Sequence, residues 1–253
     1  MDELLVERRG AAAVVVLNRP KRRNALTAGL MVELAETMDS LDADESIGAI
    51  VLTGSDPAFC AGLDLTELAG DADNLHVDQT GRPWSRLRTP VIGAINGPAI
   101  TGGLELVLHC DFAIASERAA FADTHARVGV MPGWGMSVLL PQAVGLRRAK
   151  RMSLTGNFVT AEAALAWGLV SEVVPHEKLI ATAVALAEDA SSVDRRAAAT
   201  LLTLYDDNAD DQTASGLRRE YVLAREWRDG VFQSNTIVER GGAVRDRGRS
   251  QMS

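Results

Sequence analysis

The chain has 253 residues, of which 47% are hydrophobic and 24% are charged, a composition typical of a globular protein with a buried core. Its formal net charge of −8 argues against a nucleic-acid partner, which normally meets a basic face. No apolar run approaches the length needed to cross a bilayer, so we expect no membrane partner.

Cysteine usage and the N-terminal residues indicate the compartment. Cys60 and Cys110 lie in apolar contexts without Cys-x-x-Cys spacing, which is typical of free thiols in a reducing environment. Acidic residues occupy the N-terminal positions where a signal peptide would be basic, and no apolar segment follows them. The sequence therefore predicts a cytoplasmic protein.

The first half of the chain alternates short apolar runs with helical patterns. Residues 11–17, 48–53 and 91–95 read as buried strands, and each is followed by turn residues. Between the first two strands, Thr27 is placed to cap a helix that extends to Leu41. This alternation predicts parallel strands joined by crossover helices.

The second half of the chain is predominantly helical by pattern. It is preceded by a polar segment, residues 70–82, which we expect to lie at the surface. The tail after Gly241 carries three arginines and few apolar residues, so we expect it to lack order unless a neighbour covers it. Helices are predicted over residues 144–154, 161–167, 177–189, 194–205 and 216–228.

The segment 89–111 carries the clearest chemical signal. An apolar strand passes through a turn into Gly102-Gly103, where a helix begins. Glycines at a helix start let the backbone approach a ligand, and the free N–H groups there favour an oxyanion. Glu105 follows in the first turn, between two leucines, where its carboxylate could act as a general base or acid. Alternatively, the glycines serve only close strand–helix packing and Glu105 is a solvated acid.

A second loop of similar design precedes it. Residues 56–65 also follow a strand and place Gly62 before an acidic residue, Asp64. The simpler interpretation is a strand-to-helix loop in which Asp64 caps the helix.

Taken together, the two loops make the chain recognisable. Residues 59–65 and 96–106 resemble the paired signatures of the enoyl-CoA hydratase/isomerase (crotonase) superfamily. The similarity covers nearly the whole chain and continues in residues 18–26, 110–115, 129–135, 154–156 and 161–170.

The resemblance implies an α/β fold, a right-handed spiral of ββα units followed by a C-terminal helical region. It assigns residues 1–190 to the spiral core with its acyl-CoA site, and residues 191–253 to a helical region that builds a homotrimer or a dimer of trimers. No metal is expected, because the histidines show no ligand spacing. No cofactor is implied either, since coenzyme A enters as part of the substrate.

The resemblance also implies site residues. The backbone N–H groups of Leu63 and Gly102 would form the oxyanion hole, and Glu105 would be the first catalytic glutamate. The acyl-CoA contacts would fall on Arg22, Ala25, Ala61, Gly62, Leu63, Asp64, Leu65, Gly102 and Gly103.

One departure from the family pattern matters most for function. Where typical hydratases carry a second glutamate, this chain has His125. A histidine that titrates near its ordinary pKa of about 6.5 could replace the acid as proton donor, or it could be structural and bonded to Asp123. Thr101 also replaces a usual glycine and narrows the pocket beside Gly102.

The sequence favours a lyase that adds water to a 2-enoyl-CoA, as in fatty acid and other lipid metabolism. The alternatives are another acyl-CoA reaction (isomerisation, decarboxylation or thioester hydrolysis) or an acyl-CoA-binding protein with impaired catalysis. Acyl chain length, pathway, and trimer against hexamer stay undetermined.

Overall fold

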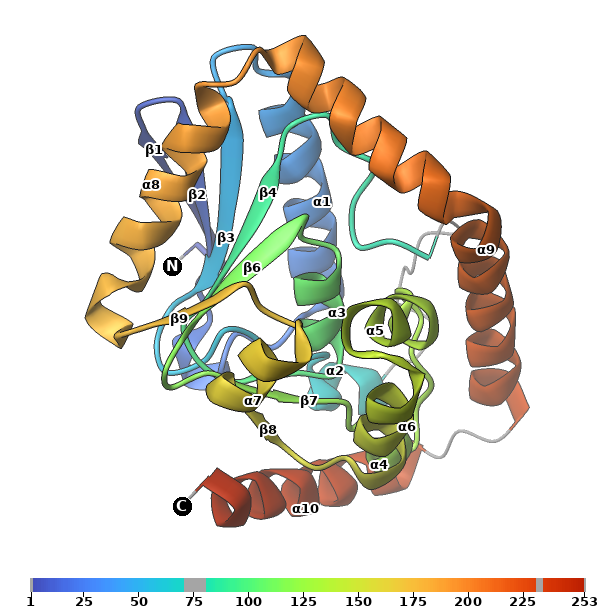
Figure 1. Ribbon diagram of the computed structural model, residues 1–253. Helices are drawn as coiled ribbons and strands as arrows, with labels where there is room; N and C mark the ends of the chain where they lie inside the picture. The colour runs from blue at the N-terminus through green and yellow to red at the C-terminus, as the bar shows by residue number, and fades with distance from the viewer. Residues whose placement is uncertain (1, 71–80, 231–233, 253) are drawn as a thin grey trace.

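A six-stranded sheet forms the centre of the computed structural model, which describes residues 2–70, 81–230 and 234–252 (Figure 1). Its strand order is β1-β2-β3-β4-β6-β9, with β1 antiparallel to β2 and the other neighbours parallel. The strands are β1 (Leu4–Arg9), β2 (Ala12–Leu17), β3 (Ala49–Gly54), β4 (Val91–Ile95), β6 (Phe112–Ser116) and β9 (Glu172–Val174). The three predicted strands are thus confirmed within one residue at each end, and their pairing is parallel as expected.

A smaller sheet continues from the carboxyl ends of two central strands. It contains β5 (Ala99–Ile100), β7 (Ala120–Ala122) and β8 (Val159–Thr160), in the order β5-β7-β8. The chain leaves β4 and enters β5 three residues later, and it passes from β6 to β7 in the same way. The segment 96–106 therefore includes a point where the chain changes from one sheet to the other.

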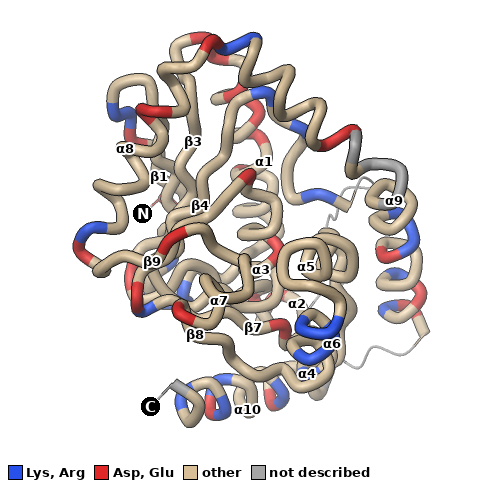
Figure 2. The backbone as a smooth tube through the Cα atoms, viewed as in Figure 1, with Lys and Arg blue, Asp and Glu red and all other residues tan. Residues whose placement is uncertain are grey.

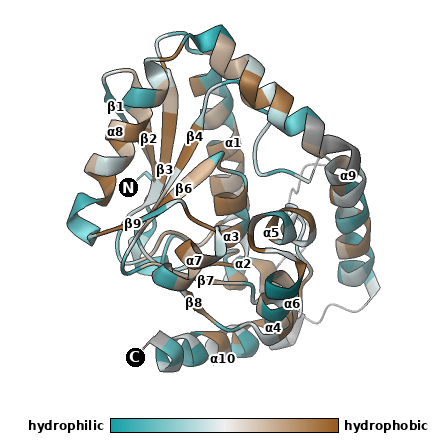
Figure 3. Ribbon diagram, in the orientation of Figure 1, coloured by the Kyte–Doolittle hydropathy of each residue, from teal (hydrophilic) through white to brown (hydrophobic). Residues whose placement is uncertain are grey.

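Helices bury both faces of the larger sheet. On one face, α8 (Leu179–Ser191) packs against alternate strand residues such as Val14, Val51 and Ile92. On the other, α1 (Ala28–Ala43) and α3 (Gly102–Leu108) join the main core with residues such as Val15 and Leu52. Because strand side chains alternate between faces, the apolar runs supply both clusters, and the central strands are hydrophobic along their length (Figure 3).

The second half of the chain is helical as predicted, but it differs from the prediction in detail. The helices over residues 125–128 and 136–144 were not predicted. A single helix, α9 (Arg195–Gly230), replaces the two helices predicted over its length. Residues 242–252 belong to α10 (Ser234–Met252), which packs against residues 65–70, so the tail has the covering neighbour on which its order was expected to depend. The remaining helices are α2 (Leu65–Gly70), α4 (His125–Val128), α5 (Met136–Val144), α6 (Leu146–Thr155) and α7 (Ala161–Trp167), with 3-10 turns η1 (Pro20–Arg22) and η3 (His176–Lys178).

Close packing explains why the arginine-rich tail folds. A side chain on Gly241 would collide with Leu65, so the absent Cβ lets α10 lie directly on α2. Ile237 and Val244 bury their side chains in a cluster with Leu68 and Val128. The predicted surface segment 70–82 falls largely on residues 71–80, which lie outside the described residues. Among the described residues, no helix is long and apolar enough to cross a membrane.

Candidate active site

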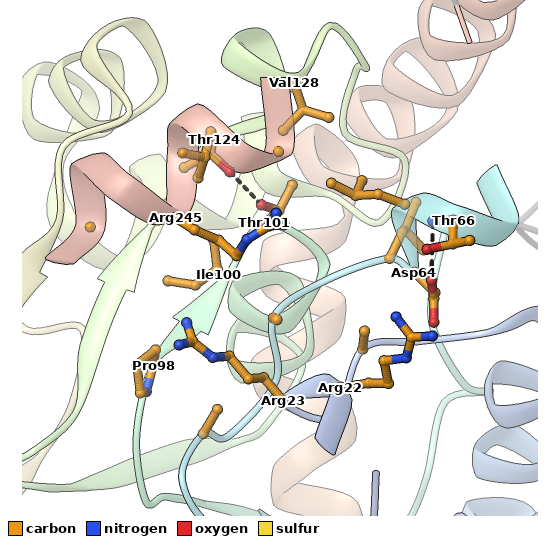
Figure 4. Close-up of a pocket in the computed structure, with 18 of the residues that line it drawn as sticks. Arg22, Arg23, Asp64, Thr66, Pro98, Ile100, Thr101, Thr124, Val128 and Arg245 are labelled. Atoms are coloured by element: carbon orange, nitrogen blue, oxygen red, sulfur yellow. Dashed lines mark hydrogen bonds between the residues drawn. The ribbon is translucent and has the colours of Figure 1, made fainter. Parts of the chain in front are cut away.

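A cavity of about 460 Å³ lies between the loops that the sequence singled out and α10 (Figure 4). Several predicted acyl-CoA contacts line it: Arg22, Ala25, Ala61, Leu63, Asp64 and Leu65. Apolar side chains of α2, α4 and α10 form another part of the wall, among them Leu68, Val128 and Val244. The remaining predicted residues, Gly62, Gly102, Gly103, Glu105 and His125, lie outside this lining.

The two predicted oxyanion donors are close neighbours. A Cβ placed on Gly102 would lie 3.8 Å from the Leu63 nitrogen and 3.6 Å from the Gly62 Cα. Neither the Leu63 nor the Gly102 N–H donates a hydrogen bond to any residue that the structure describes. Gly102 is also the first residue of α3, so its N–H belongs to the unpaired first turn. The backbone therefore presents two adjacent free donors.

Gly62 and Gly103 are glycines for different reasons. Gly62 has a φ of 86°, and a Cβ there would lie 2.8 Å from the Ile100 carbonyl oxygen. A Cβ on Gly103 would lie 2.2 Å from the Cys60 carbonyl oxygen, so this glycine allows the two loops to touch. The packing interpretation thus holds for Gly103, whereas Gly102 has room around it.

Thr101 is held in an unusual conformation beside the donors. Its φ of 57° and ψ of −114° are unfavourable for a β-branched residue. Its hydroxyl is 2.8 Å from the Thr124 hydroxyl, and both residues are buried and line the cavity (Figure 4). This contact joins the residue before Gly102 to the residue before His125.

Glu105 is buried rather than solvated, with 3% of its surface exposed. It lies in the first turn of α3, and its Oε1 accepts a hydrogen bond of 2.8 Å from the Trp134 backbone N–H. The Trp134 carbonyl oxygen in turn lies 2.7 Å from His109 Nε2. The loop before α5 therefore fixes one oxygen of the carboxylate and leaves Oε2 for other partners.

His125 lies between two carboxylates, at the start of α4. Its Nδ1 is 2.8 Å from Asp123 Oδ1, and its Nε2 is 3.4 Å from Glu105 Oε2. All three side chains are at most 5% exposed. The two alternatives left open for His125, a catalytic group or one bonded to Asp123, are therefore compatible.

The charges around His125 change its protonation. Burial by itself would lower the pKa of His125, but Glu105 and the hydrogen bond to Asp123 outweigh it and raise the pKa to about 10. The same contact holds the pKa of Asp123 below its ordinary value despite burial. Titration near 6.5 was therefore the wrong expectation, and His125 is an imidazolium at neutral pH.

A buried amide fixes the first loop of the site. Asn24, in a left-handed conformation with φ of 55°, donates to the carbonyl oxygens of Ser55 and Ala58 at 2.8 and 2.7 Å. Its Oδ1 accepts a hydrogen bond of 2.9 Å from the Arg19 N–H. Ala25 is thereby held beside the 56–65 loop.

Asp64 has the structural role that its sequence position suggested. Its Oδ1 accepts a hydrogen bond of 3.1 Å from the Thr66 N–H at the start of α2, and Arg19 is 3.1 Å from Oδ2. Burial would raise the pKa of Asp64, but the Thr66 N–H and the charge of Arg19 lower it.

Cationic side chains from two distant parts of the chain share the cavity wall. Lys21, Arg22 and Arg23 come from the loop before α1, and Arg245 and Arg249 come from α10. Basic residues recur along α10 and α6 (Figure 2). The cavity thus combines an apolar wall with an anion-attracting one, although the whole chain is acidic.

Sequence reasoning missed three contributors. Trp134 and Asn24 stood within recognised motifs but had no assigned role, and Asp123 was considered only as a structural partner. Trp134 acts through its backbone N–H, which carries no residue-type signal, whereas an asparagine before the Thr27 cap could have been singled out.

The comparisons with known proteins agree with this geometry. Residues 7–230 match the family model described as enoyl-CoA hydratase/isomerase. An enoyl-CoA hydratase structure from Mycobacterium tuberculosis H37Rv is 47% identical with a TM-score of 0.85, covering 90% of this chain and all of that one. One from Mycobacterium smegmatis is 44% identical with a TM-score of 0.84, over 91% and 100%.

A curated Rhizobium meliloti (strain 1021) protein named "Probable enoyl-CoA hydratase" is 41% identical over 88% of both chains. The crotonase-like fold predicted from the sequence is therefore confirmed, with its α/β core and C-terminal helical region. The chain belongs to the enoyl-CoA hydratase/isomerase family.

Proposed function

We propose that the protein catalyses the reversible addition of water to the double bond of a 2-enoyl-CoA. The observation that carries this proposal is the Glu105–His125 pair, with Oε2 and Nε2 3.4 Å apart. His125 directly follows Thr124 of the cavity wall, and Glu105 lies one helical turn after Thr101 of the same wall. A carboxylate next to an imidazolium provides a proton acceptor and a proton donor in one place. The two free N–H groups of Leu63 and Gly102 provide the oxyanion site that such a reaction requires.

These groups are sufficient to transfer every proton that the proposed reaction requires. Glu105 takes a proton from water as the oxygen bonds to C3, and electrons move into the thioester oxygen, which the Leu63 and Gly102 N–H groups stabilise. The enolate then re-forms the carbonyl as C2 takes a proton from His125. Transfer of the proton held by Glu105 to His125 restores both groups.

The cationic wall fits the rest of the substrate. Arg22, Arg245 and Arg249 border the cavity, and guanidinium groups suit phosphate oxygens because several N–H donors point the same way. The apolar wall suits an acyl chain. We therefore assign the phosphates of coenzyme A to the arginines and the acyl group to the wall formed by α2, α4 and α10.

The wider setting follows from the same proposal. A homotrimer or dimer of trimers would cover the exposed apolar side chains of α9, which include Leu201, Leu204 and Leu223. Enoyl-CoA hydration suits a cytoplasmic enzyme of lipid metabolism. Acidic net charge supports the absence of a nucleic-acid partner.

The proposal is tested by measuring the turnover of crotonyl-CoA. The reaction is monitored as the loss of absorbance of the double bond that is conjugated to the thioester. We expect measurable hydration by the wild type and a loss of roughly a hundredfold or more in Glu105→Gln. Glu33→Gln, a change at an exposed position of α1, is the control. Product binding should persist in Glu105→Gln, because that side chain is not part of the cavity wall. Wild-type binding without turnover would refute the proposed enzyme and favour an acyl-CoA-binding protein.

A further inference from the structure

The long helix α9 contacts the loops that hold both members of the Glu105–His125 pair. Its Glu220 reaches the loop before α5, and its Trp227 reaches the loop after α4. Neither residue lines the cavity described above. The two contacts come from one helix, although the loops that they hold adjoin different catalytic groups.

Glu220 binds the loop that positions Glu105. Its Oε1 accepts from the Gly135 N–H at 2.5 Å, and its Oε2 accepts from the Ser137 N–H at 2.6 Å. The neighbouring Trp134 N–H donates to Glu105 at 2.8 Å. Two carboxylates, one from α3 and one from α9, thus bind three N–H groups of a single turn. Moving this turn would move the donor that fixes Glu105 Oε1.

The burial of Glu220 indicates how tightly this contact is determined. The residue is 7% exposed. Burial and the nearby charge of Glu105 raise the pKa of Glu220, while the Ser137 and Gly135 donors lower it. Packing supports the hydrogen bonds, because a side chain on Gly135 would collide with Leu217 of α9. A buried carboxylate beside a second one requires such donors.

Trp227 binds the loop that follows His125. Its indole Nε1 donates to the Gly129 carbonyl oxygen at 2.9 Å. The Gly129 N–H donates to the His125 carbonyl oxygen at 2.9 Å, with Gly129 in a left-handed conformation that ends α4. The indole therefore anchors the turn that sets where the backbone of His125 lies.

Glu220 and Trp227 are seven residues apart and so lie on the same face of α9. That face packs against α5, as the arrangement in Figure 1 shows. We infer that Glu220 and Trp227 are positioning residues that together hold Glu105 and His125 at their contact distance. The kinetic test of this inference rests on the proposed hydration. A second test measures the pKa of His125 and depends only on the structure of the pair.

Two conservative substitutions test this. Glu220→Gln keeps the side-chain size but turns one acceptor oxygen into an NH₂ group facing a backbone N–H. Trp227→Phe keeps an aromatic ring but removes the five-membered ring of the indole, including its N–H donor. Glu226→Gln, at an exposed position between them on α9, is the matched control.

We expect kcat for crotonyl-CoA to fall about tenfold in each variant, because small displacements of catalytic groups are costly. The KM should stay within about twofold of wild type, since neither side chain lines the cavity. A merely structural role would lower the melting temperature and leave kcat of the folded protein unchanged. Unchanged kcat in folded Glu220→Gln and Trp227→Phe overturns the inference, as does a rise in KM alone. If Glu220→Gln does not fold, Trp227→Phe decides.

A second readout separates this inference from the proposed function. The pKa of His125, followed by nitrogen NMR of the imidazole, depends on Glu105 and Asp123, the charged groups that face it. Both variants should lower this pKa relative to Glu226→Gln, because a displaced Glu105 stabilises the imidazolium less. An inactive wild type whose His125 pKa falls in the variants refutes the proposed function and supports the positioning role. A His125 pKa equal in all four proteins overturns the positioning role.

Discussion

At the scale of single residues, the protein differs from a two-carboxylate site at one position, where the imidazolium of His125 replaces a carboxylate and changes the local charge by two units. His125 brings a positive charge between Glu105 and Asp123, and its contact with Asp123 holds the pKa of that carboxyl below its ordinary value despite burial. A second carboxylate at this position would face Asp123 directly, at the distance where His125 Nδ1 now donates. The imidazolium and Asp123 therefore belong together, and the substitution of a family glutamate is structurally compensated.

The first prediction concerns the proton donor. His125→Ala should lower hydration by roughly a hundredfold or more, in the range expected for a positioned acid. His125→Glu should also have low activity, because this substitution places three carboxylates together. Asp123→Asn combined with His125→Glu removes that repulsion and should recover part of the rate. The measurement is kcat for crotonyl-CoA, and equal rates in wild type and His125→Ala would end the assignment.

The second prediction concerns stability against pH. The pKa of His125 is about 10 in the folded chain and about 6.5 when unfolded. The imidazolium therefore contributes stability that is fully present below about pH 6.5 and is lost as pH rises toward 10. Urea denaturation across this window should show the free energy of unfolding of wild type falling more steeply than that of His125→Gln. Parallel slopes would contradict the raised pKa.

At the scale of elements, two adjacent glycines at the start of α3 have different roles. Gly102 is assigned to the proposed oxyanion site, and Gly103 serves packing. Gly102 offers a free N–H beside Leu63, and a Cβ there would make only ordinary van der Waals contacts, whereas Gly103 lies against the Cys60 carbonyl. The chain enters α3 through the strained Thr101, which is supported by its hydrogen bond to Thr124. A helix start can thus be shaped for a ligand only because the preceding residues are held by tertiary contacts.

The third prediction uses this contrast. Gly102→Pro should keep α3, because proline is tolerated at the first helical position, but it deletes one oxyanion donor. We expect turnover to fall by at least about a hundredfold while circular dichroism shows a folded protein. Gly103→Ala should instead lower the melting temperature, because its Cβ overlaps Cys60. Full activity in folded Gly102→Pro would contradict the thioester site.

At the scale of the whole molecule, α9 has two different faces. Leu217 is buried against the chain's own loop at Gly135. Leu201 and Leu223 keep 50% and 54% of their surface exposed, and such apolar exposure along one helix is typical of an interface. The helix therefore both contacts the candidate site and exposes apolar side chains on another part of its surface.

The fourth prediction concerns assembly. Light scattering at micromolar concentration should give the mass of a trimer or of a dimer of trimers. Leu223→Glu should shift this mass toward the monomer, because a buried unpaired carboxylate is costly. Leu154→Glu, at an 80% exposed position on α6, serves as the control and should leave the mass unchanged. A monomeric wild type would contradict the prediction.

The sequence by itself determined what is encoded locally. Apolar runs such as 91–95 predicted buried strands, because a strand buried on both faces needs no polar alternation. The glycines of the two loops, together with Glu105 in the first turn of a helix, predicted an oxyanion-binding site in these segments. These signals depend on neighbours only a few residues apart.

Only the tertiary structure decided the protonation of His125 and the contacts of α9 and α10. The Glu105–His125 contact joins α3 to α4, and Gly135 and Glu220 are 85 residues apart in sequence. The arginine-rich tail is helical because Gly241 fits against Leu65 of α2. A pKa depends on which charges share a buried space, and a marginal helix depends on what covers it, so neither follows from local residue types.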